Sequence, residues 1–204
     1  MCWVALDRAV RLASKRSLAA PTVEWAAERD PIAEDVWSNF RHPEKGHFVQ
    51  VRGGREVDAS LFTMPLMRFA SATDPVWLST LDAIRDELSD DGTIKRYRTP
   101  DGLPGEEGSF STCSFWYVEC LARARRLEEA HLAMEEGLQH ANHLGLFSED
   151  LIPTGEQSGT SPRRSPTSPS LVQLTFSTAN SISPRSAPDN PRPSAAKPYE
   201  TCAI

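Results

Sequence analysis

Arg96–Leu121 reads RYRTPDGLPGEEGSFSTCSFWYVECL, and this stretch decides how the chain folds. Its first half is polar and contains two prolines and three glycines, which predicts a loop. Its second half, Phe110–Leu121, is apolar on nearly every side, which predicts a buried, central helix. A charged loop at the end of a buried helix is a common way to form a concave polar site.

The helices predicted on either side of this stretch are of two alternating kinds. Ala59–Phe69 is mostly apolar, with Asp58 as its predicted N-cap and Pro65 as a predicted kink. Val76–Leu88 and Leu127–His143 instead carry one apolar stripe and one charged face. An inner ring of fully buried helices inside an outer ring with one wet face would produce this alternation. Strands are nearly absent from the pattern, so an all-α fold is predicted.

Two further helices are predicted before this region. Met1–Arg16 places Trp3 and Ala13 on one apolar face. Val23–Phe40 is either one helix or a kinked pair, because Pro31 indicates a kink or a fresh N-terminus.

Composition argues against several classes of protein. The 204 residues carry a net charge of −6 with no basic cluster, so no nucleic-acid partner is expected. No apolar run approaches a transmembrane length and no signal peptide is visible, so a cytoplasmic protein without a membrane partner is expected. Cys113 and Cys120 lie two helical turns apart, too far for a disulfide, and are predicted to be buried thiols. No C-x-x-C motif or Cys/His cluster occurs, so a structural metal site is not expected.

Four segments, in order, resemble glycoside hydrolase family 15, the bacterial glucoamylases and trehalases. They are Met1–Ala13 (MCWVALDRAVRLA), Phe48–Phe69, Arg96–Trp116 (RYRTPDGLPGEEGSFSTCSFW) and Gly145–Gln157 (GLFSEDLIPTGEQ). The resemblance implies a toroid of six helical hairpins, an (α/α)6 fold, of which residues 1–157 would form about three hairpins. It also implies inverting hydrolysis of an α-glucosidic bond, without a metal or an organic cofactor.

An inverting glycosidase needs two carboxyl groups, roughly 6.5–9.5 Å apart, on opposite sides of the scissile bond. The resemblance places the general base at Glu149, in the pair Ser148-Glu149. Sequence physics alone favours an ordinary loop acid near a helix end at this position, and the resemblance reverses that preference. Arg96 or Arg98 matches a family arginine that hydrogen-bonds sugar hydroxyls, and both remain candidates.

Other polar and aromatic residues have two readings each. Glu106 and Glu107 can rim the substrate pocket, or they can be acids favoured by the dipole of the helix that follows. Trp116 and Tyr117 can stack on a sugar ring, but residues of an apolar helix are more often core, and core is the prediction.

The general acid of the family is a glutamate in a Trp-Glu segment that precedes the equivalent of Met1. This sequence contains no Trp-Glu pair. The chain is therefore expected to be a fragment, inactive alone, that a separately encoded N-terminal half can complete. The alternative is a non-catalytic helical-hairpin interaction module.

Ser158–Ile204 differs from everything before it. It contains half of the 16 prolines and no apolar period, which predicts a disordered tail outside the 1–157 domain. Codons for the family sequence expected after GEQ, with one base deleted, can read as the residues at 159–167. This is the basis of a hypothesis that the tail is an out-of-frame translation.

Overall fold

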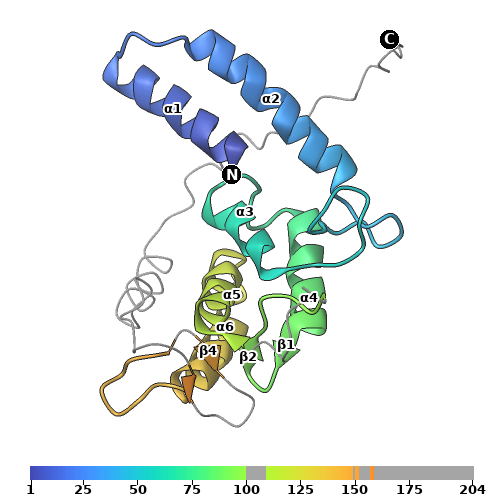
Figure 1. The fold of residues 1–204 in the computed structure, drawn as a ribbon, viewed down its shortest axis with the longest axis vertical. Coiled ribbons are helices and arrows are strands. Elements are labelled where there is room, and N and C mark those ends of the chain that lie inside the picture. The colour runs from blue at the N-terminus through green and yellow to red at the C-terminus, as the bar shows by residue number, and fades with distance from the viewer. Residues whose placement is uncertain (100–108, 149, 152–156, 159–204) are drawn as a thin grey trace.

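The computed structural model describes residues 1–99, 109–148, 150–151 and 157–158, and it is mostly helical (Figure 1). The described ranges hold six α-helices, one 3-10 helix (η1) and five strands of two residues each. The bounds, in chain order, are α1 Cys2–Arg16, α2 Thr22–Asn39, η1 Ala59–Phe62, α3 Thr63–Leu66, α4 Pro75–Leu88, β1 Ser89–Asp90, β2 Thr93–Ile94, β3 Ser109–Phe110, α5 Ser111–Arg123, α6 Leu127–Leu138, β4 Asp150–Leu151 and β5 Gln157–Ser158. The predominance of helix is confirmed, and the short strands were not predicted. Of the predicted tail, 158–204, the structure describes Ser158 alone, and it places this residue in β5 instead of in a disordered segment; residues 159–204 lie outside the described residues.

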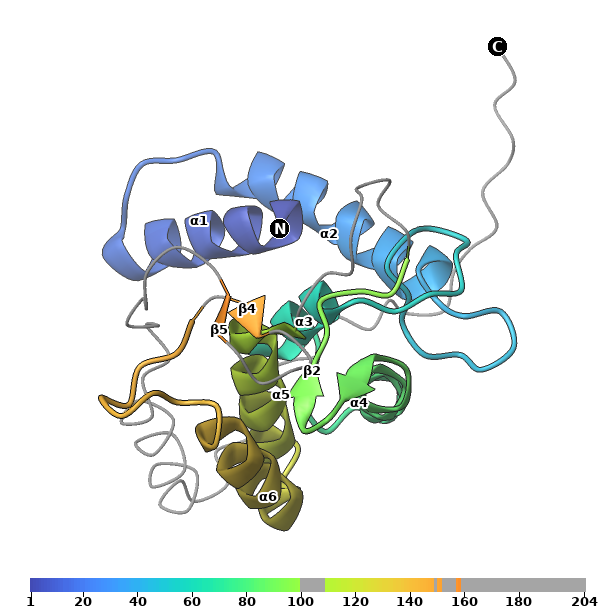
Figure 2. The same ribbon diagram turned by 60° about the horizontal axis from the view of Figure 1, so that its bottom comes forward.

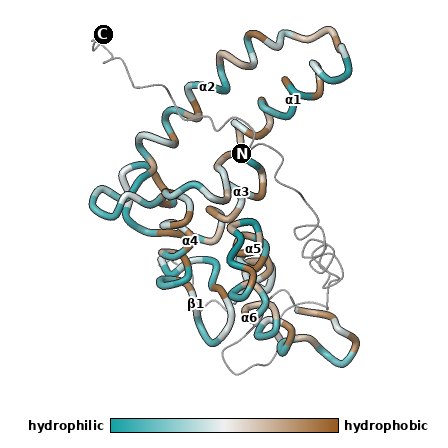
Figure 3. The backbone as a smooth tube through the Cα atoms, turned by 180° about the vertical axis from the view of Figure 1, so that it is seen from behind, coloured by the Kyte–Doolittle hydropathy of each residue, from teal (hydrophilic) through white to brown (hydrophobic). Residues whose placement is uncertain are grey.

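Helices α1 and α2 form a helical hairpin at one end of the molecule (Figure 1). Hydrophobic and hydrophilic residues alternate along both helices, as expected for helices with one wet face (Figure 3). The predicted α1 face is confirmed, since Trp3 and Ala13 are buried, and the Trp3 ring meets Phe69 edge-on at 5.0 Å. Asp7 is also buried on this face, which was not predicted.

Arginines from both helices surround the Asp7 carboxylate. Arg11 donates to it at 2.9 Å and Arg8 at 3.2 Å, and Arg29 of α2 lies 3.6 Å away. Such partners are what make a buried carboxylate tolerable. Arg8 also donates to the backbone oxygen of Met67 at 2.9 Å, which links the hairpin to the segment after α3.

Of the two readings for this segment, one helix or a kinked pair, the structure has one helix, since α2 is continuous and contains Pro31. Pro31 cannot donate to the carbonyl of Ala27. Both residues are solvent-exposed, so water can satisfy that carbonyl. The buried face of α2 is carried by Ala33 and Trp37.

The predicted helix Ala59–Phe69 is shorter and broken, as η1 followed by the single turn α3. The N-cap is confirmed, because the Asp58 carboxylate accepts the N–H of Ser60 at 2.9 Å. Pro65 has no N–H to continue an α-helical ladder back to Leu61, which explains the tighter turn before it. The chain leaves the helix at Arg68, whose φ is 63°. Leu61, Phe62 and Pro65 are nonetheless buried, as expected for a central element.

Helix α4 matches its prediction closely. The Asp74 carboxylate accepts the N–H of Val76 at 2.9 Å, and Pro75 occupies the first helical position. Its apolar stripe is at most 1% exposed, and it consists of Trp77, Leu81, Ile84 and Leu88. The β1–β2 hairpin follows, with Asp91 and Gly92 in its turn at φ values of 44° and 75°. An Asp-Gly pair with positive φ at both positions is typical of a tight hairpin turn.

Helix α5 is buried on almost every side, whereas α6 buries only Ala130 and Met134. The predicted central role of α5 is confirmed, since it contacts η1, α3, α4 and α6 and lies in the middle of the view in Figure 2. Helix α6 ends at Leu138, five residues before the predicted His143, and Leu138 is 37% exposed. The alternation of buried and one-sided helices is therefore present from η1 to α6.

Candidate active site

The N-terminal end of α5 brings together two segments that the sequence analysis singled out. Strand β3 pairs with β4 in antiparallel register, Phe110 opposite Asp150 and Ser109 opposite Leu151. The hydroxyl of Ser111 donates to the backbone oxygen of Ser148 at 2.6 Å, and both residues are buried. The start of α5 thus lies directly against the chain that contains position 149.

Three of the predicted site residues, Glu149, Glu106 and Glu107, lie outside the described residues. The base assignment and the two readings of the glutamate pair therefore stay predictions. For Glu149 the structure describes both sequence neighbours, Ser148 and Asp150.

The two candidate arginines are exposed, and they differ in what they contact. Arg98 donates to the backbone oxygen of Ser89 at 3.2 Å, at the C-terminal end of α4, where a cation is favoured by the helix dipole. The Arg96 guanidinium lies 5.6 Å from the centre of the Tyr97 ring, and its backbone oxygen accepts the N–H of Ala59 at 2.9 Å. Arg96 is therefore anchored through its backbone, which leaves its side chain on an aromatic face.

Trp116 and Tyr117 belong to the core, as predicted. Tyr117 is buried, and its ring centre lies 5.9 Å from that of Phe62. Trp116 is partly buried against the same core. Burial raises the pKa of Tyr117.

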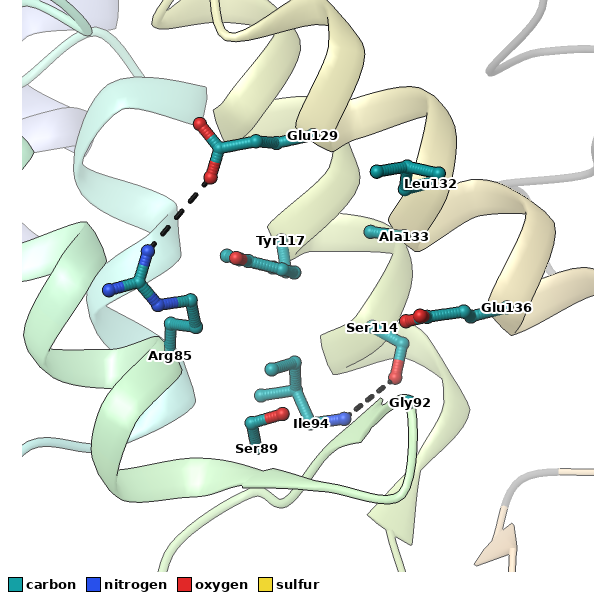
Figure 4. A pocket seen from close by; sticks show the side chains of 10 residues that line it. All are labelled: Arg85, Ser89, Gly92, Ile94, Ser114, Tyr117, Glu129, Leu132, Ala133 and Glu136. Atoms are coloured by element: carbon teal, nitrogen blue, oxygen red, sulfur yellow. Dashed lines mark hydrogen bonds and ion pairs between the residues drawn. The ribbon is translucent and has the colours of Figure 1, made fainter.

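A pocket with a volume of about 190 Å³ lies between α4, the β1–β2 hairpin, α5 and α6 (Figure 4). Its lining residues are Arg85, Ser89, Gly92, Ile94, Ser114, Tyr117, Glu129, Leu132, Ala133 and Glu136. None of the predicted site residues is among them.

The charges at the rim of this pocket are largely paired with one another. Arg126 donates to Asp82 at 2.6 Å and also to Glu129, and Arg85 lies 3.9 Å from Glu129. The hydrogen bond between Arg126 and Glu129 is the main cause of two pKa shifts. It lowers the pKa of the Glu129 carboxyl and raises the pKa of the Arg126 guanidinium. These ion pairs connect α4 to α6, so their first role is to hold the outer helices together.

Residues 1–133 match the model of the protein family described as glycosyl hydrolases family 15. That span is well over half of the 204 residues. The chain belongs to glycosyl hydrolase family 15.

Curated family 15 relatives carry the name trehalase. The chain is 41% identical over 165 residues to a trehalase of Thermoplasma acidophilum, a match that covers 80% of this chain and 28% of the relative. It is 39% identical over 167 residues to a trehalase of Mycobacterium tuberculosis, covering 80% of this chain and 24% of the relative. The chain thus spans about a quarter of the length of these relatives.

Solved glycosidases share the fold. A glycosidase variant in complex with glucose aligns with a TM-score of 0.63 at 21% identity, covering 75% of this chain and 42% of that one. The wild-type form of a glycosidase aligns with a TM-score of 0.57 at 22% identity, covering 67% of this chain and 38% of that one. The described helices therefore match part of the fold of these larger glycosidases.

The described part of this family 15 chain contains no helix long and apolar enough to cross a membrane, and no group of three or more His, Cys, Asp or Glu placed to hold a metal. Cys113 and Cys120 are buried thiols that form no disulfide, as predicted.

The sequence analysis of this family 15 chain missed the role of Ser111. A signal was present, because serines at 109, 111 and 114 surround the start of a predicted helix, where hydroxyls often bond to the backbone. The partner of each hydroxyl could not be read from the sequence. It depends on which distant segment the fold brings to that helix end.

Proposed function

We propose that residues 1–157 are one part of an (α/α)6 catalytic domain that hydrolyses an α-glucoside, with trehalose as the substrate. The observation that carries this proposal is the 41% identity to a trehalase over 80% of the chain. The alternation from η1 to α6 supports the toroid, because η1 and α5 are mostly buried whereas α4 and α6 keep a wet face. Residues 1–157 would then supply about three of its six hairpins. The proposed location of the protein is the cytoplasm.

In this proposal Glu149 is the general base. Its carboxylate takes a proton from a water molecule while the water oxygen attacks the anomeric carbon and the glucosidic oxygen leaves. One water is consumed and two glucose molecules are released from trehalose. Because the attack comes from the face opposite the leaving group, the attacked carbon inverts its configuration.

Arg96 is the better substrate ligand of the two arginines. Its guanidinium lies over Tyr97, whereas Arg98 already donates to Ser89. A guanidinium fork matches two neighbouring sugar hydroxyls, and a cation near Glu149 would favour the ionised base. Glu106 and Glu107 are proposed to line the same pocket.

The general acid comes from a second segment, because the sequence contains no Trp-Glu pair. Without a proton donor, the leaving oxygen departs roughly 10²–10⁴ times more slowly. In this proposal the rest of the toroid supplies the general acid and completes the site.

The test is reconstitution. The chain is expressed alone and together with the preceding part of the Thermoplasma acidophilum relative, and glucose release from trehalose and from maltose is measured. The chain alone is expected to be inactive and the pair active on trehalose, and Glu149→Gln is expected to lower the rate of the pair at least about 100-fold. Glu128→Gln, which changes an exposed glutamate of α6, is the matched control. Wild-type activity in the Glu149→Gln pair would refute the assignment of the base.

A further inference from the structure

The described residues on either side of position 149 contact β3 and the start of α5. Before it, the ring of Phe147 meets the ring of Phe115 edge-on, with the centres 4.9 Å apart. Next, the backbone oxygen of Ser148 accepts the hydroxyl of Ser111 at 2.6 Å. After it, Asp150 pairs with Phe110 in the β3–β4 ladder.

These contacts form one buried surface. Ser111 and Phe115 are four residues apart in α5, so their side chains lie on the same face of the helix. Ser111, Phe115, Phe147 and Ser148 are all at most 6% exposed. Water therefore cannot replace the Ser111–Ser148 hydrogen bond without opening this packing.

The Ser111 hydrogen bond acts on the peptide group that enters position 149. The backbone oxygen of Ser148 lies in the same rigid plane as the nitrogen and the Cα of the next residue. A bond to that oxygen therefore restrains the plane, and with it the point from which the side chain of residue 149 starts. The contact of Phe147 lies one residue before Ser148, and the pairing of Asp150 lies one residue after position 149, so neither acts on this peptide group directly.

We infer that Ser111 is a positioning residue for the general base: its hydroxyl orients the Ser148–Glu149 peptide plane and so aims the Glu149 carboxylate at the attacking water. This inference rests on the proposed function. Because Ser111 is buried and its hydroxyl bonds the Ser148 backbone, its removal should lower kcat and leave KM nearly unchanged. A misplacement of about 1 Å at a reacting group can cost on the order of 10²-fold in rate.

Ser114 provides a matched control in the same helix. Its side-chain oxygen accepts the N–H of Ile94 at 3.0 Å, and it is buried to a similar degree. Ser114→Ala therefore removes a comparable buried hydrogen bond, but that bond leads to β2 and not to position 149. Ser111→Thr keeps a hydroxyl at the helix start and serves as the conservative variant.

The first arm of the test uses the full chain alone and needs no activity. Hydrogen exchange is measured by mass spectrometry on peptides that contain Phe147–Leu151. Ser111→Ala should speed exchange there by about five- to tenfold, the equivalent of one buried hydrogen bond, whereas Ser111→Thr and Ser114→Ala should not. Unchanged exchange in Ser111→Ala would overturn the inference.

The second arm uses the reconstituted pair with trehalose. Ser111→Ala should lower kcat by about 10- to 100-fold with KM within about twofold, and Ser111→Thr should restore most of the loss. If Glu149→Gln abolishes turnover but Ser111→Ala matches Ser114→Ala, only the inference fails. If Glu149→Gln is active, or the wild-type pair is inactive, the proposed function fails and the positioning role falls with it.

Discussion

The hydroxyl of Thr80 ties the loop after α2 to the centre of α4, and replacing it should destabilise the fold measurably. The Thr80 oxygen accepts the backbone N–H of Phe48 at 2.9 Å and donates to the backbone oxygen of Val76 at 2.7 Å. Thr80 and Phe48 are both 0% exposed. Thr80→Val keeps the shape of the side chain and removes both hydrogen bonds.

The magnitude follows from the group left without a partner. A buried N–H that loses its acceptor costs about 1–3 kcal/mol, and the Val76 oxygen loses little because its helical bond remains. We expect Thr80→Val to lower the free energy of unfolding by about 2 kcal/mol, or the Tm by about 4–8 °C for a chain of this size. Thr80→Ser keeps both hydrogen bonds and loses one methyl group, worth about 0.8 kcal/mol.

Urea denaturation followed by tryptophan fluorescence is the assay. Trp77 lies in the same helix as Thr80 and is fully buried, and the Trp37 ring centre lies 4.9 Å from that of Phe48. The signal therefore reports both sides of the hydrogen bond. If Thr80→Val is as stable as the wild type, or more stable than Thr80→Ser, the Phe48 N–H does not depend on this hydroxyl and the reasoning is refuted.

Three further outcomes are expected. The pKa of His47 is lowered from 6.5, mainly by burial and then by the charges of His42, Lys45 and Arg41. Below pH 6.5 the unfolded state therefore takes up a proton before the folded state does. Stability should therefore be complete above that pH and fall as the pH drops from 6.5 toward the lowered pKa; urea midpoints at pH 7.5 and 5.5 test this, and an equal pH dependence in His47→Gln would contradict it. Pro31→Ala should raise the free energy of unfolding by up to about 3 kcal/mol, because it restores a helical N–H at an exposed site of α2, and a lower urea midpoint would argue against this account of the helix. Burial raises the pKa of Cys120 well above its usual value, so iodoacetamide should alkylate the exposed Cys2 in the folded chain and Cys120 only after unfolding; equal rates, measured by peptide mass spectrometry, would disprove the burial of Cys120.

Local chemistry explains which helices were predicted well. Helix α4 has an acidic N-cap, a first-turn proline and a complete apolar stripe, so all local signals agree on its start and its face. The segment from Ala59 to Phe69 is mostly apolar, and this predicts burial but not conformation. Pro65 there changed the backbone, whereas Pro31 in α2 did not, because α2 can expose the carbonyl that a proline leaves unpaired.

The candidate site was predictable only in part. Glu149, Glu106 and Glu107 were assigned from the resemblance and lie outside the described residues. Arg96 and Arg98 could not be separated in the sequence, since both flank Tyr97 in the same polar run. The structure separates them by their contacts, because only Arg98 reaches the end of α4.

The sequence by itself determined the helical class, the burial of α5 and the family, because periodicity, capping residues and motif order are all properties of residues close together in the chain. Only the tertiary structure decided that Ser111 bonds Ser148, that Thr80 bonds Phe48 and that arginines enclose Asp7. The Ser111 and Thr80 contacts join residues 37 and 32 positions apart. A hydroxyl can bond to almost any polar group, so its partner is chosen by which segment the packed core brings within reach.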